Sequence, residues 1–121
     1  MPLPDALIAQ CPSRGLIARL GEKWAMLVMV ILLAGPIRFG ALRRRIEGIS
    51  QKMLTQALRA LERDGLVERT VVSTRPLAVE YRLTALGTDL APLALQLKLW
   101  AETRLHEIEE ANTRYDRSVS D

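Results

Sequence analysis

The chain has 121 residues, of which 49% are hydrophobic and 26% charged, with a formal net charge of +3. This length fits one domain, and the composition is that of a globular rather than a disordered chain. One cysteine and one histidine exclude an internal disulfide, a cysteine-rich zinc site and a histidine-based metal cluster. The longest uncharged run, residues 24–37, is too short for a membrane helix, and no positively charged secretory signal opens the sequence. We therefore expect a cytoplasmic protein without a cofactor.

The positive charge gathers in the middle of the chain. Residues 38–82 hold ten basic and five acidic side chains, whereas residues 100–121 hold three basic and six acidic ones. A basic middle beside an acidic end predicts a surface that faces a polyanion on one side of the molecule. An ordinary mixed, solvated surface is the alternative, and charge alone does not decide between the two.

Two helices are predicted before the first extended segment. Pro12, a residue favoured in a first helical turn, begins a helix that Gly21 ends. Residues 23–33 form a second helix that is apolar nearly all round, so we expect it to be the buried central helix. The glycine and proline at 35–36 stop it, and a short extended piece follows over residues 37–39.

A helix-turn-helix is predicted over residues 40–64. Residues 40–46 form its short first helix, and Gly48 serves as a left-handed cap after it. Ser50 is a good N-cap for a longer helix over residues 51–64. The apolar side chains of this longer helix recur at spacings of three and four, which places them on one face. They are Met53, Leu54, Ala57, Leu58 and Leu61.

A β-hairpin, the wing, is predicted over residues 66–83. Residues 66–72 are rich in β-forming side chains, and residues 79–83 alternate strictly between apolar and polar or charged ones. Between them lies a turn over residues 73–77, in which Pro76 keeps the backbone out of a regular ladder.

Thr84 is predicted to cap a last helix that runs to Asn112 with a kink at Pro92, followed by a frayed tail over residues 113–121. Large apolar side chains recur along this helix at alternating spacings of four and three. They offer more apolar surface than one small domain needs, so we interpret the excess as a homodimer interface. Packing back on the core is the alternative. The interface candidates are Leu93, Leu97 and Trp100.

This order of elements is that of a winged helix-turn-helix: a mainly α fold with a small β-hairpin wing, in one domain over residues 1–112. The helix over residues 51–64 would read DNA, because a major groove admits one helix and base edges bind basic, amide and hydroxyl side chains. The preceding arginines, the helix start at Ser50 and the tip residue Arg75 would contact phosphates or a minor groove. The DNA-binding candidates are Arg43, Arg44, Ser50, Gln51, Lys52, Thr55, Gln56, Arg59 and Arg75.

Two other classes of function are weaker. A winged helix that binds protein instead of DNA would favour exposed apolar residues on the helix over residues 51–64, and its polar face carries none. An enzyme is less favoured still, because no Ser–His–Asp set, glycine-rich phosphate loop or metal quartet can be assembled from this chain.

Several short motifs resemble the HxlR-type winged-helix regulators, relatives of the MarR group. They are Cys11-Pro12, Leu20-Gly21 with Lys23-Trp24, Gly35-Pro36 with Arg38-Phe39, the run from Ile49 to Gln56, and the run from Val79 to Thr84. The resemblance covers about residues 11–100. It implies a homodimeric bacterial transcription factor that pairs through its N- and C-terminal helices and binds pseudo-palindromic DNA, often as a repressor. Glu22 stands where many relatives have a second glycine.

The same resemblance singles out Cys11. Some HxlR-type proteins sense oxidants or electrophiles through a cysteine near the N-terminus, and Cys11 falls at that place. As the N-cap of the first helix, its thiol would lie where the helix dipole favours the thiolate, with Arg14 one turn further on. Without a second cysteine, the products would be a Cys11–Cys11′ disulfide, a mixed disulfide or an adduct. An inert, partly buried side chain is the alternative.

Overall fold

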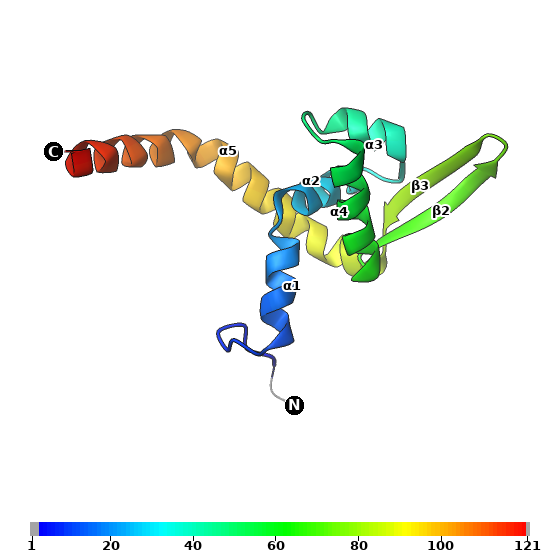
Figure 1. Ribbon diagram of the computed structural model, residues 1–121, viewed down its shortest axis with the longest axis horizontal. Helices are drawn as coiled ribbons and strands as arrows, with labels where there is room; N and C mark the ends of the chain where they lie inside the picture. Colours follow the sequence, from blue (N-terminus) through cyan, green and yellow to red (C-terminus); the bar gives the residue numbers. More distant parts are fainter. Residues whose placement is uncertain (1–2, 121) are drawn as a thin grey trace.

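Five helices and a small sheet make up the computed structural model, which describes residues 3–120 (Figure 1). The elements are α1 (Pro12–Leu20), α2 (Lys23–Leu32), β1 (Ile37–Arg38), α3 (Phe39–Arg45), α4 (Gln51–Arg63), β2 (Val67–Thr74), β3 (Leu77–Leu83) and α5 (Ala85–Ser120). The predicted mainly α fold with a β-hairpin wing is confirmed, and the helix ends before residue 65 differ from prediction by at most one residue.

The predicted central helix is α2. Val28, Met29 and Leu32 are almost completely buried, and α2 packs against both α4 and α5. Buried residues of α3, α4, β2, α5 and the loops between them complete the core: Leu42, Ile46, Ile49, Leu54, Leu58, Leu61, Leu66, Val67, Ala91 and Ala94. No polar or charged side chain among the described residues is buried, so apolar burial holds these elements together.

Local caps fix the helix ends, and the sequence predicted those at Ser50 and Gly48. The hydroxyl of Ser50 accepts a hydrogen bond from the backbone N–H of Met53 at 3.0 Å, which confirms the N-cap of α4. Gly48 has φ +87°, a left-handed conformation that favours glycine. Glu22 also acts as a cap, because its carboxylate accepts from the N–H of Ala25 at 2.9 Å.

The sheet is antiparallel, with strand order β1-β3-β2. Its hairpin strands extend further than predicted, because pairing continues to Thr74 opposite Leu77 with one bulge after Val71. The turn therefore contains only Arg75 and Pro76, joined by a cis peptide bond. The prediction that Pro76 disrupts the ladder across residues 73–77 is wrong, since a proline within the turn removes no ladder hydrogen bond.

A close backbone approach sets the start of α5. The hydroxyl of Thr84 donates to the carbonyl of Gly65 at 2.6 Å and accepts from the N–H of Gly87 at 3.1 Å, which confirms Thr84 as the cap. A Cβ atom at Gly87 would lie 2.0 Å from the carbonyl oxygen of Leu66. Glycine at this position therefore lets α5 begin directly against the end of the helix-turn-helix.

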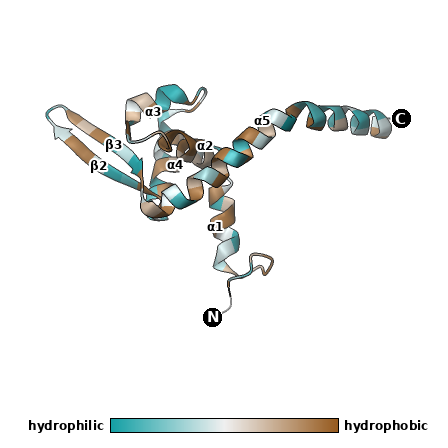
Figure 2. Cartoon of the chain, turned by 180° about the vertical axis from the view of Figure 1, so that it is seen from behind, coloured by the Kyte–Doolittle hydropathy of each residue, from teal (hydrophilic) through white to brown (hydrophobic). Residues whose placement is uncertain are grey.

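The predicted end of the last helix at Asn112 is wrong, because α5 continues to Ser120 and includes most of the predicted tail; Asp121 lies outside the described residues. The helix is also continuous through Pro92 and curves along its length (Figure 1). Hydrogen bonds and ion pairs within the helix support its far half, including those of Arg104 with Glu107 and of His106 with Glu110. Figure 2 shows this half as mostly hydrophilic and projecting away from the other elements.

Candidate nucleic-acid interface

The helix α4 presents two chemically distinct faces. Leu54, Ala57, Leu58 and Leu61 are buried against the core, as predicted. The opposite face exposes basic and amide side chains: Gln51, Lys52, Gln56, Arg59 and Arg63. Among the predicted contacts on this helix only Thr55 is half-buried, at the edge between the faces. The prediction omitted Arg63, although its spacing of four from Arg59 places both on the same side of the helix.

The start of α4 offers backbone donors. An α-helix leaves its first four N–H groups without partners inside the helix. Ser50 satisfies the N–H of Met53, which leaves those of the first two helical residues at the exposed helix end. Such groups, together with the helix dipole, bind phosphate oxygens.

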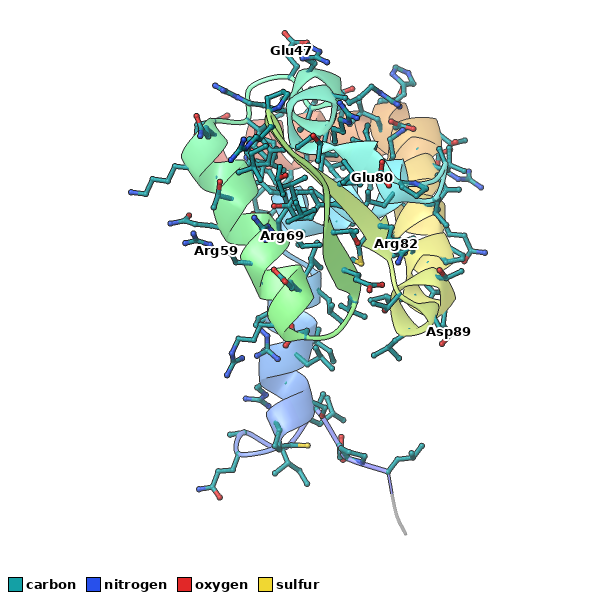
Figure 3. All side chains as sticks on the ribbon, turned by 90° about the vertical axis from the view of Figure 1, so that its right-hand side faces the viewer. Glu47, Arg59, Arg69, Glu80, Arg82 and Asp89 are labelled. Atoms are coloured by element: carbon teal, nitrogen blue, oxygen red, sulfur yellow. The ribbon has the colours of Figure 1, made fainter. Side chains whose placement is uncertain are left out.

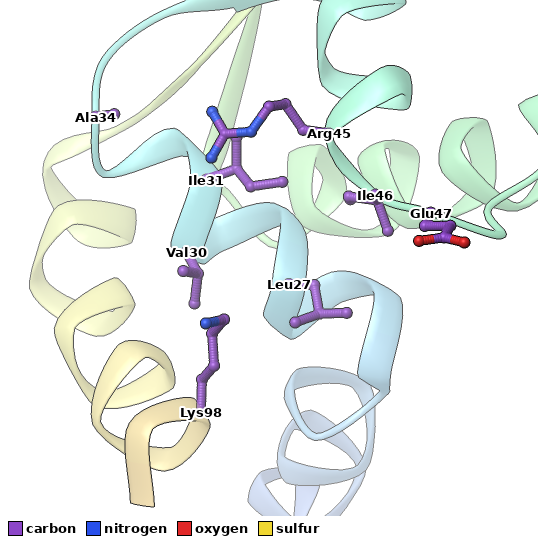
Figure 4. A pocket seen from close by; sticks show the side chains of 8 residues that line it. All are labelled: Leu27, Val30, Ile31, Ala34, Arg45, Ile46, Glu47 and Lys98. Carbon is purple, nitrogen blue, oxygen red and sulfur yellow. The ribbon is translucent and has the colours of Figure 1, made fainter. Parts of the chain in front are cut away.

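Three consecutive arginines end α3, the first helix of the helix-turn-helix. Arg43, Arg44 and Arg45 are all exposed in its last turn, where the helix dipole favours cations. Arg45 differs from the other two in direction. It reaches over α2 and, with Lys98, borders a cavity of about 350 Å³ (Figure 4).

The two faces of the wing carry different charges. Arg69 pairs with Tyr81 across the hairpin, and Glu68 pairs with Arg82. Opposed residues on antiparallel strands share a face, so Arg69 lies on the same face as Tyr81. On this face the ring centroid of Tyr81 lies 6.5 Å from that of Phe39 in α3. The other face carries Glu68 and Arg82, whose side chains form a 3.3 Å ion pair.

Figure 3 shows Arg59 and Arg69 on one side of the molecule, and Glu80 and Arg82 on the other. Arg69 was absent from the predicted site because its face follows from the strand register, which the sequence pattern did not specify. At the hairpin turn, Arg75 is exposed as predicted.

The basic side chains of this surface have no acidic partners. Within residues 3–120, no ion pair forms at Arg43, Arg44, Lys52, Arg59, Arg63, Arg69 or Arg75. Elsewhere, ion pairs engage bases on α1, β3 and α5. We name these seven unpaired residues of α3, α4 and the wing the basic face. Its charges are available to an external polyanion.

A bidentate ion pair connects α1 to the end of α4. The Nε and Nη2 atoms of Arg19 lie 3.0 and 3.2 Å from the two carboxylate oxygens of Asp64. This hydrogen-bonded carboxylate raises the pKa of Arg19 above its usual value. The contact therefore ties the N-terminal helix to the helix that carries three of the seven residues of the basic face.

Cys11 is the N-cap residue of α1 and is half-buried. Its Sγ atom lies 3.0 Å from the hydroxyl of Ser13. Hydrogen bonds from the side chain and backbone of Ser13 lower the pKa of the Cys11 thiol, because they favour the thiolate. The guanidinium of Arg14 donates to the carbonyls of Ala6 and Leu7 at 2.9 and 2.8 Å.

An apolar surface runs along α1 and the first half of α5. The three predicted interface residues are exposed: Leu93 by 60%, Leu97 by 52% and Trp100 by 55%. Two adjoining hollows of about 250 and 260 Å³ separate the two helices. Their apolar lining includes Leu16, Ile17, Leu20, Leu86, Leu90, Leu93 and Leu97. We name this lining, together with Trp100, the α1–α5 apolar surface.

Two expectations concern other kinds of site. Among residues 3–120, no three histidine, cysteine, aspartate or glutamate side chains gather as a metal-binding group, and the imidazole of His106 instead contacts Glu110 at 2.8 Å. None of the described helices has a long enough apolar stretch to cross a membrane.

Comparisons with known proteins agree on one family. The family model described as HxlR-like helix-turn-helix matches residues 19–109. The uncharacterized HTH-type transcriptional regulator YtfH of Escherichia coli (strain K12) is 42% identical over 99 residues, covering 82% of this chain and 79% of the relative. The solved structure of YtfH from Salmonella typhimurium has a TM-score of 0.86 at 36% identity, covering 92% and 99%. The redox regulator HypR in its oxidized form has a TM-score of 0.70 at 41% identity, covering 77% and 96%.

Proposed function

Because the chain belongs to the HxlR-like helix-turn-helix family and is thus a DNA-binding transcriptional regulator, we propose that it acts as a homodimeric repressor of a pseudo-palindromic operator. It would act in the cytoplasm and without a catalytic step. The observation that carries this proposal is the basic face, in which seven exposed bases on three adjoining elements lack acidic partners within the described chain.

The elements of the basic face would contact different parts of the DNA. Lys52, Gln56 and Arg59 project from the exposed side of α4, where a helix in the major groove presents its side chains to base edges. Gln51 and Thr55 flank them. Arg43, Arg44 and the N-terminus of α4 at Ser50 would hold phosphates, and Arg75 would reach the adjacent minor groove or backbone.

The α1–α5 apolar surface would pair two copies. Leucines from both helices line adjoining hollows without any cover from the described chain, and leaving this much apolar area in water is unfavourable. A two-fold axis through this surface would repeat the basic face on the second copy. Two copies of α4 could then read two half-sites in successive major grooves.

Fluorescence anisotropy of the reduced protein on DNA from upstream of its own gene tests the proposal. A scrambled duplex of equal length is the control, and both are measured at two salt concentrations. The proposal expects tight binding that prefers the native sequence and weakens steeply with salt, because bound phosphates release counterions. Absence of binding to either duplex at low salt would contradict DNA binding and favour a protein partner.

The proposal includes a response to oxidants or electrophiles through Cys11. HypR, a structural relative, is a redox regulator. In this chain the Cys11 thiol is partly exposed, and its pKa is lowered by hydrogen bonds from Ser13. A lowered pKa increases the reactive thiolate near neutral pH. Two such thiolates could give up two electrons to an oxidant such as diamide and form a Cys11–Cys11′ disulfide between copies.

Two variants test this response. Cys11→Ser should abolish the effect of diamide on DNA binding while leaving the reduced affinity unchanged. Ser13→Ala should move the onset of thiol alkylation to higher pH, because the thiolate loses the hydrogen bond that lowers its pKa. A Cys11→Ser protein that still responds to diamide like the parent would show that the cysteine is inert.

A further inference from the structure

No other element of the described chain packs over the far half of α5. Every side chain from Leu99 to Ser120 is exposed, and this segment projects away from the other elements (Figures 1 and 2). At 1.5 Å per residue it is roughly 30 Å long. Most of the stability of a helix in a protein comes from packing of one of its faces, so packing against another surface would stabilise this segment.

One stripe of this segment is apolar and follows a seven-residue repeat. Its members are separated by four, three, four, three and four residues: Ala101, Leu105, Ile108, Asn112, Tyr115 and Val119. The four large side chains are between 45% and 67% exposed. This is the spacing of the inward-facing a and d positions of a coiled coil, with Leu105, Asn112 and Val119 at a and Ala101, Ile108 and Tyr115 at d.

We propose that this stripe pairs with the same stripe of a second copy as a parallel, in-register, two-stranded coiled coil. The inference rests on the homodimer of the proposed function and specifies how its C-terminal helices meet. A single asparagine at an a position, as at Asn112, selects register and oligomeric state in such dimers. In a parallel pair, each Asn112 faces the same residue of its partner and both amides are satisfied.

The flanking charges decide the orientation. The positions beside the seam on one edge, e, are all acidic: Glu102, Glu109 and Asp116. An antiparallel pair would bring these acidic edges together, which is unfavourable. A parallel pair instead sets each acidic edge against the partner's other edge, g, which carries no acidic residue and consists of Arg104, Ala111 and Ser118. Arg104 already contacts Glu107 of its own helix at 2.9 Å and lies within reach of a partner helix.

Cysteine cross-linking tests the arrangement in the full chain, on a Cys11→Ser background. Leu105→Cys alone and Val119→Cys alone should each form disulfide-linked dimers on mild oxidation, because an in-register parallel seam places each residue beside its own copy. Glu110→Cys, on the outer face, is the matched control and should stay monomeric on a denaturing gel. Linking only in a mixture of the Leu105→Cys and Tyr115→Cys proteins, an a and a d position, would show an antiparallel pair and overturn the proposal.

Absence of any seam cross-link would also overturn the coiled-coil proposal. DNA binding by the same variants is measured in parallel, so that failure of the coiled coil can be told apart from failure of the proposed function. A second measurement uses Asn112→Leu, which replaces the polar seam residue with an apolar one. The dimer dissociation concentration in analytical ultracentrifugation should fall roughly tenfold, since a buried polar a residue lowers the stability of the pair. Thr113→Leu, one residue outside the seam, should leave it unchanged; equal effects of the two variants would contradict the seam.

Discussion

The two ends of this molecule expose different kinds of side chain. At one end, α3 and α4 pack their apolar side chains against the core, and these helices and the wing leave seven bases without acidic partners in the described chain. At the other end, α1 buries no residue and the far half of α5 exposes leucines, whereas bases such as Arg104 have acidic partners. The first end therefore presents seven positive charges without acidic partners, and the second presents apolar side chains that no other part of the described chain covers.

This difference indicates two kinds of partner. Unpaired cations on a rigid, well-packed scaffold suit a polyanion such as DNA, because binding then requires little reorganisation. Exposed apolar stripes on projecting helices suit another protein surface, and a second copy supplies one with matching geometry. Substitutions at the two ends should accordingly change different measurements.

The largest expected effect comes from the core beneath the basic face. Leu58 is 2% exposed on the inner side of α4. Leu58→Ala should lower the free energy of unfolding by about 2–5 kcal/mol, because the lost methyl groups leave a cavity. Urea unfolding at several protein concentrations measures this. Trp100→Ala is the contrasting control. The loss of stability that it causes should grow on dilution of the dimer, and a loss that does not depend on protein concentration would place Trp100 outside the interface.

The next effect concerns base reading by α4. Arg59→Ala should cost about 1–3 kcal/mol of binding free energy on the operator and much less on random DNA, because a base contact is lost. Arg75→Ala, at the wing tip, should weaken binding to both duplexes similarly. Anisotropy titrations with operator and scrambled duplexes compare the two variants. Equal losses for Arg59→Ala on both duplexes would refute its base-reading role.

A smaller effect is expected at the cap of α4. Ser50→Ala removes the hydroxyl that accepts from the N–H of Met53 and should lower the free energy of unfolding by about 1 kcal/mol. Thermal unfolding at fixed protein concentration measures it. Ser50→Asp should preserve the cap, yet weaken DNA binding because a carboxylate would face phosphate. If Ser50→Asp bound DNA as tightly as the parent, the helix start would lie away from the backbone.

The smallest effect separates the two faces of the wing. Arg69→Ala should reduce the magnitude of the log–log salt slope of DNA binding by about 1 for each copy in the dimer, the signature of one lost phosphate contact per copy. Arg82→Ala should leave the slope unchanged, because Arg82 lies on the other face and pairs with Glu68. It should also change the stability by at most about 1 kcal/mol, as expected for an exposed ion pair. A larger slope change for Arg82→Ala would reverse the assignment of the DNA-facing side.

Local features of the sequence predicted much of the fold. The cap at Ser50, the left-handed glycine at 48 and the apolar spacing along α4 depend on neighbours within one or two helical turns, so the pattern contains their cause. The face opposite that apolar stripe follows from the same periodicity, which is why most predicted contacts on α4 are exposed. The prediction that α5 ends at Asn112 was wrong because contacts within the helix, such as those of His106 with Glu110 and of Thr113 with Glu109, support its continuation to Ser120.

The sequence by itself determined which residues form the helix-turn-helix, which of them face inward, and that Cys11 occupies the N-cap position of α1, because short-range sterics and periodicity fix these. Only the tertiary structure decided that Arg69 shares a side with Arg59 and that Arg19 binds Asp64. These depend on strand register and helix docking, which bring together residues far apart in the chain. Long-range packing sets such contacts, and no local pattern encodes them.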